Sequence, residues 1–146
     1  FVKHNEKFNE VNVGAHEGTD CVECHNPHER AINVKTACTS CHDDEPFKSF
    51  AKTRHGKAAV ECVDCHMPRA TKSAIKTGKF SGDVRTHMVR INVDPKASMF
   101  KPAMSKGKKV TYAKGFVTLD FACLNCHGSR DKEWAAKEAK NYHGTN

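Results

Sequence analysis

The feature that most constrains the fold is a five-residue motif that occurs four times. Eight cysteines fall into four pairs with two residues between partners, and a histidine follows each pair at once. The motifs are CVECH at 21–25, CTSCH at 38–42, CVDCH at 62–66 and CLNCH at 123–127. Disulfide frameworks and zinc ribbons also use paired cysteines, but neither requires a histidine in the fifth position of every motif. The repeated histidine therefore disfavours both of those interpretations.

The CxxCH motif is the attachment signal of c-type haem. Two thiols one helical turn apart bond to the two vinyl groups on one edge of the porphyrin, and the next residue lies under the macrocycle as the proximal iron ligand. The sequence therefore predicts four covalently attached haem c groups, and no catalytic residues. The haem-binding residues are Cys21, Cys24, His25, Cys38, Cys41, His42, Cys62, Cys65, His66, Cys123, Cys126 and His127, in which the four histidines are the proximal ligands.

The composition agrees with a core built largely from haem. Apolar residues make up 38% of the chain, below the roughly 45–50% that is usual for soluble globular domains. A conventional core would therefore be thin, and porphyrins would supply much of the buried apolar mass. We predict a multihaem cytochrome c fold in a single domain, 1–146, with mostly irregular loops and a few short helices around four haems.

Local patterns predict a few regular elements. Residues 129–142 form the clearest helix, with Ser129 as its cap. The partial alternation over 84–93 favours a short strand, and residues 104–121 favour a hairpin arm between two glycines. A short echo between the first and third motifs suggests two dihaem units, 1–50 and 51–146.

Six further histidines are candidates for the distal face of the irons. The first candidates are His16, His28, His55 and His87, followed by His143 and His4 near the chain ends. For any lone histidine the alternative is a surface or packing role. Methionine can also bind haem iron and raise its potential, but with six spare histidines the methionines are better interpreted as packing residues. We therefore expect bis-histidine ligation throughout.

His28 lies only three residues after the proximal ligand His25. Histidines on opposite faces of one iron have Cα atoms about 13 Å apart, whereas three residues span at most about 10–11 Å. His28 therefore cannot close the other face of the haem held by His25. It is either a structural residue or the ligand of a neighbouring haem, and the second interpretation is the expectation here.

Charge and hydropathy limit the possible partners. The formal net charge is +7, but four ferric haems, each roughly −1 with its two propionates, would lower it to about +3 in the oxidised protein, so basicity is no argument for nucleic acid. No apolar run is long enough to span a membrane. Phe1 opens the chain with neither Met nor an apolar signal segment, as is typical of a processed product. Covalent haem attachment also implies a location outside the cytoplasm.

Two segments beyond the motifs carry a family resemblance. HGKAAVECVDCHMPR at 55–69 and GDVRTHMVRIN at 82–92 resemble tetrahaem subunits of extracellular cytochrome filaments, the cytochrome nanowires. That resemblance implies bis-histidine haems in a continuous chain, copies of the same subunit as partners, and at least one iron ligated by a histidine from the next subunit. It further implies electron conduction to external acceptors at the cell surface.

The expected function is electron transfer without catalysis. The alternative is a monomeric periplasmic shuttle between redox partner proteins. A multihaem reductase is a third, less favoured reading, because it needs one iron with an open site. Every motif ends in histidine and distal candidates are in surplus, so the sequence favours an electron carrier.

Overall fold

A computed structural model describes residues 1–3, 7–30, 34, 36–140 and 142–143. The first half of the chain contains short helices joined by turns: α1 (Lys7–Asn12), α2 (Cys21–Cys24), η2 (Cys38–Ser40), η3 (Phe50–Lys52), α3 (Arg54–Lys57) and α4 (Cys62–His66). No described residue from 11 to 67 is buried. The polypeptide therefore forms no apolar core of its own in this half, where three of the four motifs lie.

The second half holds the sheets. Strands β1 (Val2–Lys3), β2 (Thr71–Gly78) and β3 (Ser81–Val84) form one sheet, in which β1 and β2 are parallel and β2 and β3 antiparallel. Strands β4 (Ile91–Asn92) and β7 (Val117–Thr118) pair in parallel. The Asp83 carboxylate accepts backbone N–H groups of Ser73, Ala74 and Ile75, and these bonds lower its pKa to about 2. Asp83 thereby pins β2 where its register against β3 shifts.

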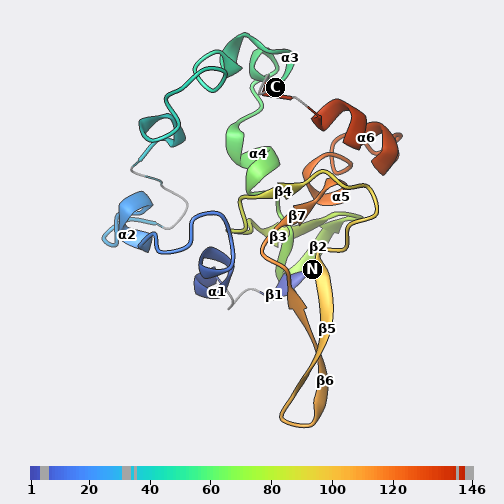
Figure 1. Cartoon of the computed structure of the whole chain (residues 1–146). Coiled ribbons are helices and arrows are strands. Elements are labelled where there is room, and N and C mark those ends of the chain that lie inside the picture. The colour runs from blue at the N-terminus through green and yellow to red at the C-terminus, as the bar shows by residue number, and fades with distance from the viewer. Residues whose placement is uncertain (4–6, 31–33, 35, 141, 144–146) are drawn as a thin grey trace.

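A hairpin projects from the body of the molecule, as Figure 1 shows. It consists of β5 (Phe100–Ser105) and β6 (Lys108–Ala113), joined by a turn at Lys106 and Gly107. Both turn residues have positive φ, which suits the right-handed twist of a two-residue hairpin. The predicted arm over 104–121 was half right, because β6 forms its first part while the chain beyond Gly115 enters β7 and α5 (Leu119–Ala122).

The apolar core lies under the sheets and beside the fourth motif. One cluster gathers Val2, Ala70, Met88, Met99, Val117, Phe121 and Ala122, and a second gathers Leu119, Leu124 and Ala135. Met88 and Met99 are thus buried among apolar side chains, as packing residues are. Helix α6 (Lys132–Ala139) covers the second cluster with Ala135. It is shorter than the predicted 129–142, because the Asp131 side chain, rather than Ser129, accepts from Trp134 N and begins the helix.

The strand predicted over 84–93 was wrong for most of its length. β3 ends at Val84, β4 begins at Ile91, and residues 85–90 belong to no strand. The alternation is real, because Thr86 and Met88 are fully buried and their neighbours are not. The backbone bonds, however, go elsewhere: Thr86 N donates to Pro68 O and His87 N to the Glu10 side chain. The alternating pattern therefore reflects burial on one side without a strand partner.

Candidate haem sites

Each CxxCH motif folds as about one helical turn. The first forms α2 with His25 directly after it, the second begins with η2, the third is α4, and the fourth starts directly after α5, at its C-cap Cys123. His25 N donates to Cys21 O, His42 N to Cys38 O and His127 N to Cys123 O, at 2.8–3.0 Å. Residues at i, i+3 and i+4 share one side of a helix. Both thiols and the imidazole of a motif are therefore presented together.

The first and third motifs each contain an acidic residue with a structural role, and this role explains why the two motifs are similar. In α2 the Glu23 side chain accepts the Asp20 backbone N–H at 3.1 Å, and in α4 the Asp64 side chain accepts that of Glu61 at 2.9 Å. These side chains satisfy a backbone donor at the start of a helix, as in a capping box. The similarity of CVECH and CVDCH therefore follows from how each short helix begins.

Every proximal histidine has a second histidine facing it. The ring centroids lie 6.1 Å apart for His16 and His42, and 6.2 Å apart for His25 and His87. They lie 5.8 Å apart for His55 and His127, and 5.9 Å apart for His66 and His143. We refer to these pairs by their motifs as sites 1 (His25), 2 (His42), 3 (His66) and 4 (His127).

The spacing of the pairs fits an iron held between two imidazoles. A histidine nitrogen binds a metal ion at about 2.0–2.1 Å, which places the centroids of two opposed rings roughly 6 Å apart. All four observed separations are close to this value. The eight cysteines are free thiols, with two in each motif. The residues present therefore fit a c-type haem at each site.

Hydrogen bonds at Nδ1 orient two of the rings. His66 Nδ1 lies 2.8 Å from Val89 O, and His55 Nδ1 lies 2.6 Å from the Tyr142 hydroxyl. A neutral imidazole that offers Nε2 to a metal carries its proton on Nδ1, so Nδ1 is the donor in both bonds. This arrangement leaves Nε2 free on each ring.

Site 1 differs, because both of its Nδ1 atoms are buried without a partner. His25 Nδ1 and His87 Nδ1 are the buried polar side-chain atoms that lack a hydrogen bond within the described ranges. Burial lowers the pKa of His87, and Lys7 adds to the effect. Burial likewise lowers the pKa of His143, next to His66. Both rings are thus biased toward the neutral form that binds a metal.

Sites 2, 3 and 4 lie next to one another. Burial and then neighbouring Cys38 raise the pKa of the Cys62 thiol, and burial together with neighbouring Cys123 raises the pKa of the Cys65 thiol to about 11. The Phe47 ring lies 5.5 Å from His42 and 5.1 Å from His143, and so joins sites 2 and 3. Tyr142 lies against both His55 and His143, and so joins sites 3 and 4. The three sites are therefore bridged by aromatic side chains.

The structure places the predicted distal candidates unequally. It brings His16, His55, His87 and His143 beside proximal rings, whereas His28 is exposed and its backbone N–H bonds Asn26 Oδ1. Within the described part of the chain, no ring contact joins His28 to another histidine. His4 lies outside the described residues. His143, and not the favoured candidate His28, therefore completes the fourth pair. No local sequence pattern predicts this, because the position of His143 depends on where the chain turns after α6.

Sequence reasoning also missed the residues that surround the histidines. Tyr142 ends the helix predicted over 129–142, but it lies beyond α6 and reaches His55. Trp134 packs against the second core cluster, and its ring also lies 5.0 Å from that of His127. The only sequence feature that could have indicated these contacts is the presence of aromatic residues close to the last motif. Three of the four histidine pairs lie within one of the two suggested units, 1–50 and 51–146. The fourth pair, His25 and His87, joins the two units.

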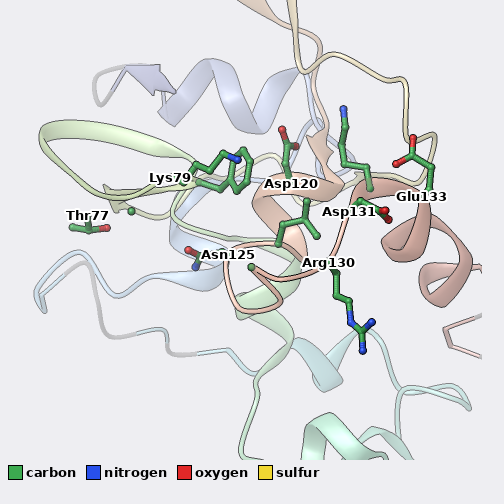
Figure 2. Close-up of a pocket in the computed structure, with 12 residues that line it drawn as sticks. Thr77, Lys79, Asp120, Asn125, Arg130, Asp131 and Glu133 are labelled. Atoms are coloured by element: carbon green, nitrogen blue, oxygen red, sulfur yellow. The ribbon is translucent and has the colours of Figure 1, made fainter.

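A cavity of about 720 Å³ lies on the other side of the fourth motif. Figure 2 shows its polar lining, which includes Lys79, Asp120, Asn125 and Arg130. No cysteine or histidine is among the described residues that line it. The cavity is therefore separate from the four histidine pairs.

Comparison with known proteins gives one family. The model of the NapC/NirT cytochrome c family, N-terminal region, matches residues 28–146 and so covers three of the four motifs. No curated protein and no solved structure matches the chain significantly. Within the described residues, no helix is long and apolar enough to cross a membrane.

Proposed function

The chain belongs to the NapC/NirT cytochrome c family, and we propose that it carries electrons through four haems, each held between two histidines. Covalently attached haem c and electron transfer follow from membership of this cytochrome family. The number of haems and their ligands are the proposal. The observation that carries it is the set of four histidine pairs, one for each CxxCH motif.

Each chain segment has a defined part in this proposal. The paired thiols of a motif fix the porphyrin edge, and the histidine of the motif binds one face of the iron. His16, His87, His143 and His55 would supply the second histidine ligand at sites 2, 1, 3 and 4 respectively. Each bound haem supplies an iron that gains and loses one electron reversibly. The aromatic contacts through Phe47 and Tyr142 support close packing of sites 2, 3 and 4.

The same pairs favour a carrier over an enzyme. A reductase needs one iron whose distal face is open to substrate. Each proximal histidine already faces a histidine of the same chain, so no distal face is left for a substrate. We therefore propose that the protein passes electrons between redox partners without catalysis of its own.

We further propose that copies of the chain assemble into an extracellular conductive filament that passes electrons to external acceptors. The resemblance of residues 55–69 and 82–92 to filament subunits supports this. The projecting hairpin supports it as well, because no residue from Phe100 to Lys114 is buried and Met104 and Tyr112 are largely exposed. Assembly needs no iron ligand shared between subunits, because each proximal histidine already faces a histidine of the same chain.

Electron microscopy of native material tests the assembly. Filaments with a short axial repeat are expected, and a hairpin variant such as Tyr112→Ser should shorten them without loss of haem. A protein that stays monomeric at high concentration would instead support the periplasmic shuttle. That outcome would leave the four-haem proposal intact, since haem content is measured on the same sample.

The hydrogen bond between His55 and Tyr142 gives a separate prediction. A histidine whose Nδ1–H donates a hydrogen bond is a more basic ligand, which stabilises the oxidised iron. Tyr142→Phe removes the acceptor and is expected to raise the potential of one haem by on the order of tens of millivolts. Redox titration followed by absorbance measures this, with the exposed hairpin residue Tyr112→Phe as the matched control. Equal titration curves for the two variants would contradict the assignment.

A further inference from the structure

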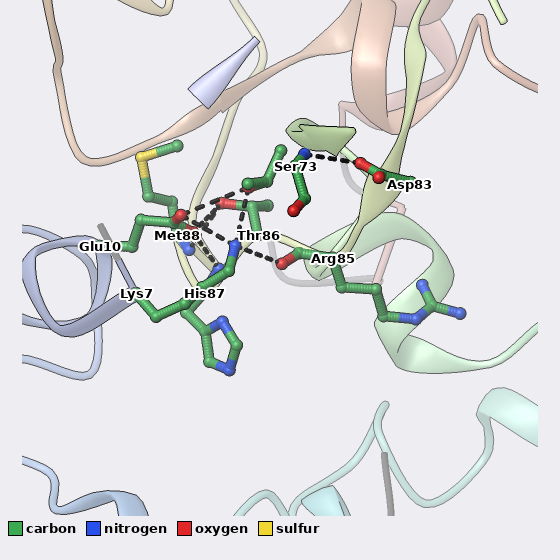
Figure 3. A network of polar contacts seen from close by, with 9 residues as sticks. Lys7, Glu10, Ser73, Asp83, Arg85, Thr86, His87 and Met88 are labelled. Atoms are coloured by element: carbon green, nitrogen blue, oxygen red, sulfur yellow. Dashed lines mark hydrogen bonds and ion pairs between the residues drawn. The ribbon is translucent and has the colours of Figure 1, made fainter. Parts of the chain in front are cut away.

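Among the described residues, the most buried charged group outside the haem sites is the carboxylate of Glu10, in helix α1. Its side chain is only 2% exposed. Four donors surround it: Lys7 Nζ at 3.0 Å, Thr71 Oγ1 at 3.3 Å, Thr86 Oγ1 at 2.6 Å and the backbone N–H of His87 at 2.5 Å. Figure 3 shows these bonds meeting at Glu10. Two of the four come from consecutive residues, and the second of them is a proposed distal ligand.

Lys7 binds the same segment from the other side of Thr86. Its ammonium donates to Arg85 O at 2.6 Å and to Thr71 Oγ1 at 2.8 Å. The Lys7–Glu10 pair therefore binds the backbone on both sides of Thr86 and ties it to β2. Met88 N donates to Thr86 Oγ1 at 3.2 Å, so the residue after His87 is fixed through the same hydroxyl.

The opposite side of the segment is tied to the third motif. Arg85 donates to Val63 O at 2.8 Å, to Met67 O at 3.1 Å and to the Asp64 carboxylate at 2.7 Å. Val89 O accepts from His66 Nδ1. Residues 85–89 are thus held between α1 and α4, and they serve two sites: His87 at site 1 and the Val89 carbonyl at site 3.

We propose that Glu10 is a positioning residue that holds His87 at its haem, through the backbone of residues 85–89. This inference rests on the proposed ligation of site 1 by His25 and His87. The segment has no strand partner of its own, so the Glu10 carboxylate replaces the ladder that would otherwise fix its backbone. The His87 ring itself has no hydrogen bond at Nδ1, which leaves the backbone as the means by which it is aimed.

Glu10→Gln is the sharpest variant, because it keeps the size of the side chain. All four surrounding groups donate to the carboxylate, whereas an amide offers one acceptor and brings a donor of its own. Each carboxylate oxygen accepts from two groups, Lys7 and Thr71 on one oxygen and Thr86 and the His87 N–H on the other, so one of these two sets loses its acceptor. The loss of one buried hydrogen bond changes a local equilibrium by about tenfold. His87 is therefore expected to leave its iron about ten times more often than in the wild type.

Carbon monoxide reports this directly, since it binds a ferrous haem only where a distal ligand has left. The wild type is expected to bind almost none, His87→Ala one molecule per chain, and Glu10→Gln at least tenfold more than the wild type. Glu138→Gln removes an exposed carboxylate on α6 and should behave as the wild type does. Electron paramagnetic resonance should show a shifted low-spin signal from one haem, and thermal unfolding distinguishes this from general destabilisation.

A Glu10→Gln protein that binds no more carbon monoxide than the wild type, while His87→Ala binds one molecule, overturns the role of Glu10 and leaves the ligation intact. Carbon monoxide binding to every haem of the wild type, or to none in His87→Ala, would overturn the ligation of site 1 by His87, and this inference with it. Should Glu10→Gln fail to mature, Thr86→Val removes one donor to the carboxylate while keeping the buried volume. Thr86→Val is expected to bind more carbon monoxide than the wild type, though less than Glu10→Gln would. Carbon monoxide binding equal to that of the wild type would count against the proposal.

Discussion

Replacing any one of His16, His55, His87 or His143 by alanine is expected to convert one haem in four from low spin to high spin. Each of these rings faces a different proximal histidine at about the separation that two axial ligands require. Removing one leaves its iron with five ligands, and the covalent thioether bonds keep the haem in place. Electronic absorption and electron paramagnetic resonance of the oxidised variants measure the change, and haem content should stay at the wild-type value.

His28→Ala is the matched control for these four variants. His28 is exposed and contacts no other histidine in the described part of the chain, so all haems should remain low spin in its absence. High spin in His28→Ala, together with an unchanged spectrum in His143→Ala, would contradict the pairing and restore His28 as a ligand.

Gly115→Ala is expected to lower the free energy of unfolding by roughly 3 kcal/mol or more. Gly115 has φ +78°, a conformation that costs other residues about 1–2 kcal/mol. A Cβ there would also collide with the backbone carbonyl of Val13, a group that cannot rotate away. Val13 directly follows α1, so the collision would force apart α1 and the start of β7.

Gly107→Ala separates these two contributions. Gly107 has nearly the same conformation, with φ +73°, but nothing lies within 4 Å of its added Cβ. It should lose only about 1 kcal/mol, the conformational cost alone. Denaturant unfolding followed by circular dichroism compares the two variants. Equal losses would contradict the close packing of Gly115 on Val13.

The sequence predicted the parts of the sites that depend on local spacing. In CxxCH both thiols and the imidazole fall on one side of a helical turn, and this needs no knowledge of the rest of the chain. The low apolar content predicted a thin conventional core, and no described residue from 11 to 67 is buried. Local spacing and composition were enough for these two predictions.

What the sequence could not give is set by long-range geometry. His143 faces His66 although 77 residues separate them in the sequence. Their contact depends on the chain ending α6 at Ala139 and then turning back. The position of His87 depends on a carboxylate 77 residues earlier in the chain. The alternation over 84–93 was misleading for the same reason, because burial of Thr86 and Met88 mimics a strand while the backbone bonds go to Pro68 and Glu10.

The most direct test of the central proposal is to count the haems of the purified wild-type protein and record the spin state of the oxidised form. We expect a mass increase of four haems per chain, and a spectrum that is low spin throughout with no charge-transfer band from methionine ligation. Fewer than four haems, a high-spin fraction near one quarter, or a methionine-ligated iron would contradict ligation by four histidine pairs.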